Sequence, residues 1–511
     1  MSDERTGPEL LTPAEMAEAD RLTIASGTPG ATLMRRASRA VADVVARMVP
    51  LGTRILVLCG RGNNGGDGYG AARILLRERG YPTVVAAEGP PDERAVDAVA
   101  MAKAWDGPVI GFDAVDCEPP DLVVDALLGA GLTRDVDGAT RALIERINAS
   151  GCRVVAVDLP SGVDGATGAV RGVAIQATET VTFARMKPGH VLLPGRLQTG
   201  VTRLADIGIE NETVAKVGPK AFVNGPAIWR QQLALPSVAG HKYSRGHAVV
   251  VSGPLTATGA ARLAARGALR AGAGLVTLAS PLEALGTNAA HLTAIMLAPM
   301  EGPAGLDAIL ADPRKNAVGL GPGLGVDEGT RALTRVALAS GASVVLDADA
   351  LTSFAGDLEG LASLIKARPE RPVVLTPHGG EFARLFRSLI REEGAHRRSG
   401  SKGASKLELA REAAALSGAV VVLKGADTVV ASPDGRASVA TNAPPWLATA
   451  GSGDVLAGIV TGLLAQRMPG FEAASAAVWL HGEAGQVAGI GLIAEDLPEA
   501  LPKVWAGLLE D

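Results

Sequence analysis

Two glycine-rich loops, each with an aspartate where a helix is expected to begin, stand far apart in this chain. Residues 60–68 read Gly-Arg-Gly-Asn-Asn-Gly-Gly-Asp-Gly, and residues 449–454 read Thr-Ala-Gly-Ser-Gly-Asp. Glycine lets backbone N–H groups approach an anion closely, and the positive end of the following helix dipole stabilises that anion. Two different loops of this kind in 511 residues indicate two active sites on one polypeptide.

The first loop satisfies Gly-x-Gly-x-x-Gly after a predicted strand, and Glu88 lies at the distance where an acidic residue binds a ribose. That pattern alone would suggest a nicotinamide-dependent oxidoreductase. Residues 63–68 depart from it, because two amides and a carboxylate replace the usual small apolar residues. Asn64 and its neighbours can offer oxygen ligands to a cation. The loop has no Gly-Lys-Ser/Thr, which excludes a Walker-type nucleotide loop.

Two further predicted strands end in acidic residues, Asp125 before a glycine-containing turn and Asp158 three residues before Ser161. The carboxyl ends of parallel strands form the ligand crevice of an open sheet. Asn64, Asp125, Asp158 and Ser161 are therefore expected to converge. Each acid alone would more often be a helix cap or a turn residue, but three strands that end in this way favour a site.

Residues 10–210, approximately, resemble the NAD(P)H-hydrate epimerase domain of the YjeF N-terminal type, on the stretches 60–68, 125–132, 157–165 and 187–189. The resemblance implies a potassium ion held by Asn64, Asp125 and Ser161, and a catalytic Asp158. The substrate contacts that it implies are Asn63, Asn64, Gly65, Gly66, Asp67, Gly129, Ala130, Gly131, Leu132, Thr133, Arg134, Asp135 and Asp158. Two features depart from the family pattern: residues 33–38 read Leu-Met-Arg-Arg-Ala-Ser instead of Leu-Met-Glu-x-Ala-Gly, and Arg61 replaces the usual proline.

The second loop indicates phosphoryl transfer. Its backbone N–H groups would stabilise the transferring phosphoryl group, and Asp454 would accept a proton from the attacking hydroxyl. The alternative is a flexible Gly-Ser-Gly turn in which Asp454 only caps a helix. Other predicted strand ends carry polar groups suited to the same site, namely Asp347, His378 and the Lys424-Gly425-Ala426-Asp427-Thr428 run.

Residues 240–505, approximately, resemble the ribokinase-like NAD(P)H-hydrate dehydratase family. The resemblance rests on residues 241–242, 258–260, 270–276, 321–325, 377–381, 424–428 and 451–454. It implies hydrate contacts from Ala260, Gly321, Gly323, His378 and the catalytic Asp454. It implies adenine nucleotide contacts from Lys424, Gly425, Ala426, Asp427, Thr428, Gly451, Ser452 and Gly453. Ser452 replaces the usual threonine, Gly379 the usual proline, and residues 252–254 a Gly-Gly-Ser-type turn.

The elements that must position these residues are alternating strands and helices. Continuous Val/Leu runs indicate strands buried on both faces, hence parallel sheets. The predicted strands are residues 54–59, 83–87, 122–125, 153–158, 179–183, 246–251, 274–279, 316–319, 343–347, 373–376, 419–424 and 428–431. A capping box at Thr12 opens a predicted helix to about Ile24, and a second is predicted over residues 33–48.

We therefore predict an α/β protein with two domains. A Rossmann-like three-layer αβα domain occupies residues 1–215, a linker 216–239, and a ribokinase-like αβα domain 240–511, both with mainly parallel sheets. The stretch 387–406 is rich in serine, glycine and basic residues, which indicates a solvated loop or, alternatively, a lid over phosphates.

Composition points to a cytoplasmic enzyme. A net charge of −5, from 49 basic and 54 acidic residues, lacks the excess that nucleic-acid binding requires. The three cysteines are isolated, as expected in a reducing compartment. The N-terminus lacks a secretory signal pattern, and no apolar run approaches the roughly 20 residues of a membrane span. We expect small-molecule partners, no nucleic acid, no membrane and a homo-oligomer.

The order of the two resemblances matches the bifunctional bacterial members of the family. It implies epimerisation of NADHX and NADPHX, the hydrates of NADH and NADPH, and dehydration of the S epimer at the expense of ADP. The implied cofactors are K⁺ in the epimerase domain and Mg²⁺ in the dehydratase domain. The alternative is a ribokinase-like vitamin-precursor kinase fused to a non-catalytic ligand-binding module.

Overall fold

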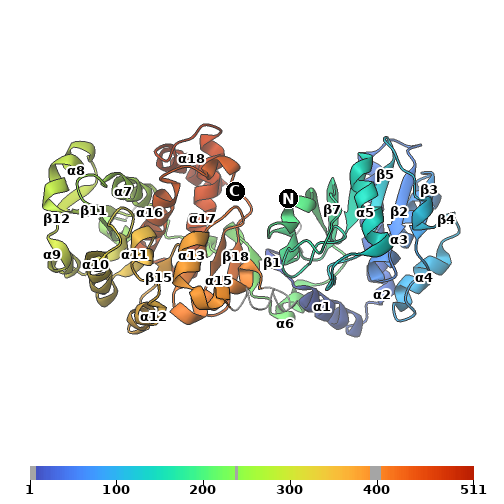
Figure 1. The fold of residues 1–511 in the computed structure, drawn as a ribbon, viewed down its shortest axis with the longest axis horizontal. Helices are drawn as coiled ribbons and strands as arrows, with labels where there is room; N and C mark the ends of the chain where they lie inside the picture. The colour runs from blue at the N-terminus through green and yellow to red at the C-terminus, as the bar shows by residue number, and fades with distance from the viewer. Residues whose placement is uncertain (1–6, 236–239, 392–403, 511) are drawn as a thin grey trace. The chain divides into compact units, whose positions relative to one another are not determined.

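The structure, a computed structural model, describes residues 7–235, 240–391 and 404–510 (Figure 1). It divides into two compact units, Met1–Ala221 and Phe222–Asp511. The division falls inside the segment predicted as the linker. Residues 392–403, most of the predicted basic loop, lie outside the described residues, so neither interpretation of that loop is tested.

The first unit is a parallel sheet in the order β4-β3-β2-β5-β6-β7-β8. Its strands are β2 (Ile55–Cys59), β3 (Thr83–Ala87), β4 (Val109–Ile110), β5 (Leu122–Ala126), β6 (Arg153–Val157), β7 (Glu179–Phe183) and β8 (Val201–Ala205). The five predicted strands of this half are confirmed. The two edge strands β4 and β8 were not predicted, because short, partly exposed strands lack a continuous apolar run.

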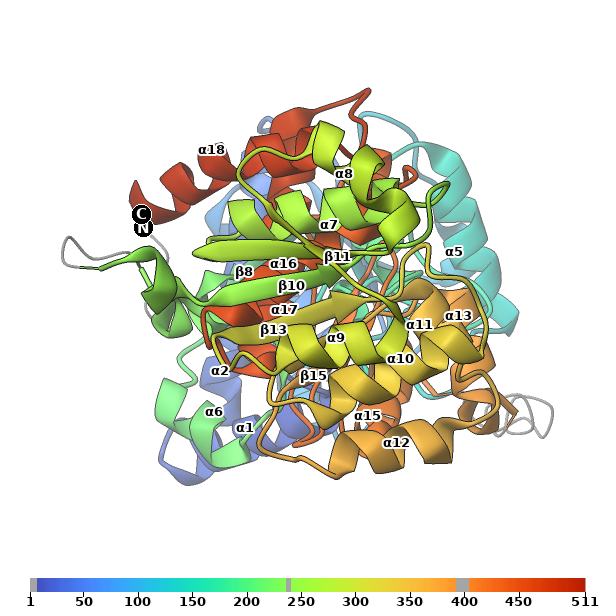
Figure 2. The ribbon, with the colours of Figure 1, turned by 90° about the vertical axis from the view of Figure 1, so that its left-hand side faces the viewer.

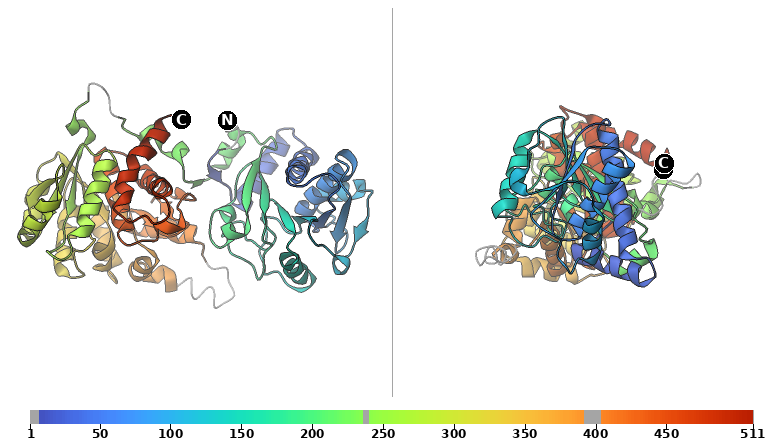
Figure 3. Two further views of the ribbon diagram at one scale, coloured as in Figure 1. Left: turned by 90° about the horizontal axis from the view of Figure 1, so that it is seen from above. Right: turned by 90° about the vertical axis from the view of Figure 1, so that its right-hand side faces the viewer.

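Helices cover both faces of this sheet, which gives three layers (Figure 3). Val57 and Cys59 of β2 belong to the core shared with α2 and α3, whereas Leu56 and Leu58 belong to the core shared with α5. Successive side chains of a strand point to opposite faces, so both faces of β2 must be apolar. The helices are α1 (Pro13–Ala25), α2 (Gly30–Met48), α3 (Asn63–Arg73), α4 (Val96–Ala104), α5 (Gly138–Ser150) and α6 (Asn211–Val217).

The two helices predicted near the N-terminus are present. The capping box of α1 forms, with Glu15 N donating to Thr12 Oγ1 at 3.3 Å and Thr12 N donating to Glu15 Oε2 at 2.7 Å. Two orphan donors of the first turn are thereby satisfied. The second helix, α2, begins at Gly30, earlier than the predicted Leu33.

The second unit has a sheet in the order β9-β18-β17-β16-β15-β14-β13-β10-β11-β12. Its strands are β9 (Ala221–Val223), β10 (His247–Val251), β11 (Leu275–Ser280), β12 (Met296–Pro299), β13 (Lys315–Leu320), β14 (Ser343–Leu346), β15 (Val373–Leu375), β16 (Val420–Leu423), β17 (Val429–Ala431) and β18 (Ala437–Val439). The strands from β12 to β16 pair in parallel, and β16, β17 and β18 pair antiparallel. The predicted α/β fold with mainly parallel sheets is confirmed.

Helices also cover both faces of this second sheet. Val250 and Val422 belong to the core formed with α7 (Gly259–Arg270), α16 (Ser452–Ala465), α17 (Gly470–Ala488) and α18 (Asp496–Glu510). Figure 2 shows α9 (Gly302–Leu310) and α10 (Glu328–Ala339) on the opposite face. The remaining helices are α8 (Leu285–His291), α11 (Ala348–Thr352), α12 (Leu358–Lys366), α13 (Gly379–Leu385) and α15 (Lys406–Ser417). Within the described ranges, none of the helices combines the length and hydropathy that a membrane span requires.

Candidate active sites

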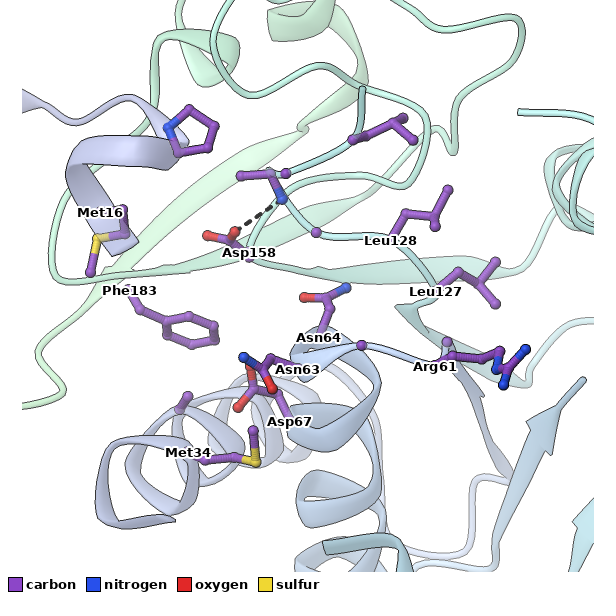
Figure 4. A pocket seen from close by; sticks show the side chains of 18 of the residues that line it. Met16, Met34, Arg61, Asn63, Asn64, Asp67, Leu127, Leu128, Asp158 and Phe183 are labelled. Carbon is purple, nitrogen blue, oxygen red and sulfur yellow. Dashed lines mark hydrogen bonds between the residues drawn. The ribbon is translucent and has the colours of Figure 1, made fainter. Parts of the chain in front are cut away.

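A cavity of about 770 Å³ lies at the carboxyl ends of the first unit's strands (Figure 4). This volume is in the range of small-molecule sites. The predicted residues that line it are Asn63, Asn64, Asp67, Gly129, Ala130, Gly131, Leu132, Thr133, Arg134 and Asp158. Three other predicted contacts, Gly65, Gly66 and Asp135, do not line the cavity.

Glycines let the first loop approach the neighbouring turn closely. A Cβ on Gly60 would lie 1.8 Å from the Leu127 carbonyl oxygen, and one on Gly65 would lie 1.9 Å from the Gly60 carbonyl oxygen. No side chain fits at either position. Asn63 and Asn64, which open α3, are thereby held beside the turn that begins at Leu127, at the floor of the cavity.

Asp158 follows β6 in the left-handed region, with φ of 65°. Its Oδ1 accepts hydrogen bonds from Lys187 Nζ at 2.6 Å and from Thr182 Oγ1 at 3.0 Å, and its Oδ2 accepts from Ala130 N at 3.3 Å. A non-glycine residue in this conformation is strained, and such strain is concentrated at functional sites. These hydrogen bonds hold the carboxylate in one orientation at the cavity wall.

Lys187 is the ion-pair partner of Asp158. Its side chain is only 2% exposed, against 17% for Asp158. Burial alone would raise the pKa of Asp158, but the charge and hydrogen bond of Lys187 outweigh burial and hold that pKa below its usual range. Asp158 is therefore ionised at neutral pH. Lys187 belongs to the 187–189 stretch on which the family resemblance rests, but the sequence did not indicate that it lies at the site.

His190 fixes the backbone around this pair. Its Nδ1 accepts from Lys187 N at 2.9 Å, so its Nε2 carries the proton that it donates to the Asp158 carbonyl oxygen at 2.8 Å. Burial and the Lys187 charge lower the pKa of His190 to about 4. The ring is therefore neutral and structural, and nothing in the local sequence indicated this role.

Four more acidic residues line the cavity, Asp20, Asp67, Glu88 and Asp97, and two of them, Asp20 on α1 and Asp67 on α3, have raised pKa values. Burial raises the pKa of Asp67 well above its usual range, and the charges of Asp158 and Asp20 add to that effect. Burial also raises the pKa of Asp20, to about 6. One ionised and two less acidic carboxyl groups therefore share the site, an arrangement suited to proton transfer. Asp20 was not predicted.

Asp125 and Ser161 lie next to each other, and neither lines the cavity. Ser161 donates to the two Asp125 carboxylate oxygens, from Oγ at 2.6 Å and from the backbone N at 2.7 Å. Burial raises the pKa of Asp125, which is 0% exposed, to about 6. Within the described residues, the hydrogen bonds that this carboxylate accepts come from Ser161 and from Leu127 N, and no lysine or arginine charge acts on its pKa. A buried charge needs a partner, and a bound cation would supply one.

The third predicted cation ligand, Asn64, has a buried side-chain amide nitrogen without a hydrogen-bond partner in the part of the chain that the structure describes. Amide oxygen and nitrogen are assigned from their partners, so the orphaned position accommodates the oxygen equally well. A carboxylate, a hydroxyl and an amide oxygen form a donor set for a hard cation. These donor types suit a hard cation, the class to which the expected potassium ion belongs.

In the second unit, Lys424 after β16 and Asp347 after β14 form a largely buried ion pair across the end of β15, the strand between them. Lys424 Nζ lies 2.8 Å from Asp347 Oδ1, and the two side chains are 19% and 3% exposed. Thr376 Oγ1 donates to the same oxygen at 2.8 Å. Asp347 was predicted as a polar strand end, but the sequence did not identify it as the partner of Lys424.

Asp454 lies in the first turn of α16, after Gly451 with φ of 84°. Burial and the charge of Asp347 raise the pKa of Asp454 to about 6, against the opposing charge of Lys424. A Cβ on Gly453 would lie 3.4 Å from Lys424 Nζ, so the loop and the lysine are neighbours. The second loop therefore places a carboxyl group of intermediate acidity beside a cation at a helix N-terminus, which suits phosphoryl transfer.

The Lys424–Thr428 turn is closed by its own side chains and by α15. Gly425 N donates to Thr428 Oγ1 at 3.1 Å, and Thr428 Oγ1 donates to the Gly425 carbonyl oxygen at 2.7 Å. Asp427, 6% exposed, accepts from Lys406 Nζ at 2.7 Å. Asp427 is thus paired within the protein, whereas Lys424 lies beside Gly453.

Two of the predicted hydrate contacts, Gly321 and Gly323, lie on loops packed against neighbouring backbone, and a third, Ala260, lies on a helix. A Cβ on Gly321 would lie 1.8 Å from the Asp347 carbonyl oxygen, and Gly323 lies against Gly253, whose Cβ would come within 2.1 Å of the Gly323 carbonyl oxygen. Ala260, in the first turn of α7, lines a void of about 10 Å³. That void holds no more than one water, so it is not a substrate site.

His378, the remaining predicted contact, caps α13. Its Nδ1 accepts from Gly380 N at 2.9 Å, and its backbone N donates to Glu381 Oε2 at 2.8 Å. Its side chain is 55% exposed. A capping role is therefore present whether or not the imidazole contacts a substrate.

Ser452 contacts a histidine that sequence reasoning missed. The Nε2 atom of His481, on α17, lies 3.1 Å from Ser452 Oγ and 3.0 Å from the Ser452 carbonyl oxygen. Burial lowers the pKa of His481 to about 4, so the ring is neutral. The histidine fixes the first turn of α16, on which Asp454 lies.

Comparison with known proteins finds a family for each half of the chain. The family model described as YjeF-related protein N-terminus matches residues 30–189, and the model described as NAD(P)H-hydrate dehydratase matches residues 248–502. A relative from Moorella thermoacetica, the bifunctional NAD(P)H-hydrate repair enzyme Nnr, is 38% identical over 98% of this chain and 97% of its own length. The chain belongs to the family of bifunctional NAD(P)H-hydrate repair enzymes.

Other known proteins are similar to the whole of this NAD(P)H-hydrate repair enzyme or to its second half. The relative of the same name from Salinibacter ruber is 37% identical over 98% of this chain and 96% of its own. Among solved structures, the ADP/ATP-dependent NAD(P)H-hydrate dehydratase from Bacillus subtilis is 29% identical, with a TM-score of 0.44. That similarity covers 54% of this chain and 95% of the Bacillus chain.

Residues that depart from the pattern expected of NAD(P)H-hydrate repair enzymes make defined contacts. Ser38 Oγ donates to the Asp67 carbonyl oxygen at 3.1 Å, and Gly70 leaves the space for it, since a Cβ there would lie 2.1 Å from Ser38 Oγ. Arg35 is exposed, and its Nη2 donates to Thr32 Oγ1 at 3.3 Å. Arg61 is exposed and donates to the Pro90 carbonyl oxygen at 3.2 Å. None of these contacts touches a proposed ion ligand.

Proposed function

We propose that the first unit interconverts the R and S epimers of NADHX and NADPHX, and that the second dehydrates the S epimer to NADH or NADPH while ADP is converted to AMP and phosphate. The observation that carries the proposal is the presence of both sites in one chain of this family: the Asp158–Lys187 pair in a large cavity, and Asp454 beside Lys424 at a helix N-terminus. Together, the two activities would repair the whole hydrate pool.

In the first unit, Asp158 is the proposed catalytic group, because it is ionised, oriented and at the cavity wall. Asn63, Asn64, Asp67 and the 129–135 turn are the proposed substrate contacts. Asn64, Asp125 and Ser161 would hold a potassium ion. The ion would neutralise the buried Asp125 charge and fix the turn that forms the cavity floor.

In the second unit, Asp454 is the proposed base that takes the proton from the substrate hydroxyl while that oxygen attacks the nucleotide phosphorus. Phosphorylation turns the hydroxyl into a good leaving group. Lys424 and the N–H groups of residues 451–453 would bind the nucleotide phosphates, together with residues 425–428. Ala260, Gly321, Gly323 and His378 are the proposed hydrate contacts.

Magnesium would reach the second site with the nucleotide. Proteins bind Mg²⁺ through one or two carboxylates together with substrate phosphates. Asp347 and Asp349 supply carboxylates at the same strand end, with Asp349 Oδ2 accepting from Gly325 N at 2.9 Å. The residues present fit the ion, which would neutralise charge on the transferring phosphoryl group.

The experiment that tests this function uses a mixed-epimer NADHX preparation, with and without ADP. The return of reduced-nicotinamide absorbance is followed against the rate of spontaneous epimerisation. Complete, ADP-dependent recovery supports both activities. Recovery that stops at the share of one epimer removes the epimerase, and stable phosphate transfer to a vitamin-precursor alcohol with no recovery favours the kinase. Light scattering tests the proposed homo-oligomer.

A further inference from the structure

Two carboxyl groups of opposite character reach the first cavity from different elements. Asp158 follows β6 and Asp67 lies on α3, and Figure 4 shows their side chains facing a common space beside Phe183. Asp158 accepts three hydrogen bonds. Among the described residues, no donor binds the Asp67 carboxyl group. Asp158 thus has the surroundings of a carboxylate, and Asp67 those of a neutral acid.

The backbone that carries Asp67 is fixed as firmly as that of Asp158. Ser38 on α2 donates to its carbonyl oxygen, and Gly66 packs so closely on α4 that a Cβ would lie 2.7 Å from Ala98 Cα. The Asp67 side chain is therefore presented to the cavity by a rigid helix, as a precise proton donor requires.

The structure of the proposed substrate indicates what Asp67 and Asp158 could each do. Water added across the ring double bond next to the ring nitrogen leaves a hydroxyl on the carbon attached to that nitrogen. The two epimers differ only in the face that carries this hydroxyl. Inversion therefore requires that a bond of that carbon breaks; the ring nitrogen assists cleavage of the carbon–oxygen bond, and the hydroxyl oxygen assists cleavage of the carbon–nitrogen bond.

We propose that Asp67 and Asp158 act on opposite faces of this carbon as an acid–base pair that removes one water and adds another, with Lys187 as the positioning residue. The inference rests on the proposed epimerase function. It makes Asp67 a catalytic residue and not only a substrate contact.

The inversion passes through loss of one water and addition of another. Asp67 gives its proton to the hydroxyl oxygen, the carbon–oxygen bond breaks with its electron pair on oxygen, and water leaves. The lone pair of the ring nitrogen forms a carbon–nitrogen double bond, which gives an iminium cation. A second water forms a carbon–oxygen bond on the other face and gives a proton to Asp158. Transfer of that proton to Asp67 through water resets the enzyme.

The charges of the cavity suit a cationic intermediate. Asp20, Asp67 and Asp158 line it, and Lys187 is engaged with Asp158, Thr182 and the Phe183 carbonyl oxygen. Once Asp67 has lost its proton, a carboxylate lies beside the iminium ion in a partly desolvated site, where attraction between opposite charges is strong. Opposite roles of the two carboxyl groups also serve the reverse reaction.

The decisive experiment uses the full chain in water enriched in ¹⁸O, with one purified NADHX epimer, no ADP and a no-enzyme control. Removal and addition of water incorporates one solvent oxygen at each inversion, detected by mass spectrometry as the opposite epimer forms. Ring opening at the carbon–nitrogen bond does not require this incorporation. Fast enzymatic inversion that leaves the original oxygen in place would overturn the inference.

The Asp67→Asn variant tests the acid. An amide cannot donate that proton, and a positioned acid contributes about 10²–10⁴-fold, so kcat for inversion should fall by that factor with little change in KM. Asp106→Asn, at an exposed carboxylate of the same unit, is the matched control. A wild-type protein without epimerase activity would refute the proposed function. An active wild type together with an Asp67→Asn variant of unchanged rate would refute only this inference.

Lys187→Met tests the positioning residue. The reaction needs one proton shared by the pair, so its rate is bell-shaped in pH. The groups that face Asp158 are Asp20 from α1, Asp67 from α3, and Lys187 and His190 after β7. Loss of the Lys187 charge raises the pKa of Asp158, so the acidic limb should move to higher pH. A loss of rate that is equal at every pH would mean a merely structural lysine.

Discussion

Variants of the Lys424–Asp347 pair allow the effect on the stability of the second unit to be measured separately from the effect on nucleotide binding. Lys424→Met leaves Asp347, 3% exposed, without its cation at 2.8 Å. Removal of one partner of a buried pair costs about 3–5 kcal/mol, whereas an exposed pair is worth about 0–1 kcal/mol. Because Lys424 keeps 19% of its side chain exposed, we expect the lower end, about 3 kcal/mol. Typical domains are stable by only about 5–15 kcal/mol, so this loss is large.

Urea unfolding followed by tryptophan fluorescence measures this loss in the second unit. The chain has five tryptophans, and all except Trp105 lie in the second unit. Lys503→Met, at an exposed position on α18, is the matched control and should leave the midpoint unchanged. The urea midpoint of Lys424→Met should fall without a change in slope.

The double variant Lys424→Met/Asp347→Asn completes the test. Asparagine carries no charge and can still accept the hydrogen bond of Thr376, so the double variant should be more stable than Lys424→Met alone. Its affinity for ADP should stay low, because the phosphate-binding cation is absent. A cost below about 1 kcal/mol for Lys424→Met, as for an exposed pair, would refute the reasoning. A double variant less stable than the single variant would also refute it.

Three further outcomes are expected. The pKa of Asp454 is raised to about 6, and a general base must be ionised to accept a proton. The dehydration rate should therefore rise with pH through about 6. A flat profile from pH 5 to 8 would contradict the role of Asp454. Gly60→Ala places a Cβ 1.8 Å from the Leu127 carbonyl oxygen, so it should lower both the thermal stability of the first unit and its epimerase rate. Gly62→Ala is the control and should be tolerated, because a Cβ on Gly62 meets nothing within 4 Å. Asp125→Asn should abolish any difference in epimerase rate between potassium and lithium salts; a difference that persists would exclude Asp125 as a ligand.

Local chemistry made much of the fold predictable. Strands such as β2 and β5 are short, continuous apolar runs because both faces are covered, so the pattern alone identified them. The Thr12 capping box and the glycine turns before α3 and α16 depend on residues close in sequence. The edge strand β8, with exposed and half-exposed residues, gave no such pattern.

The sequence by itself determined which chemical groups stand at strand ends and helix starts: Asn64, Asp125, Asp158 and Asp454 were all identified from local motifs. Only the tertiary structure decided their ionisation. Lys187 reaches Asp158 across 29 residues and Lys424 reaches Asp347 across 77, and both pairs depend on burial that distant elements create. A pKa depends on desolvation and on neighbouring charges in space, so no local pattern could show that the pKa of Asp158 is held low while that of Asp67, nearby, is raised.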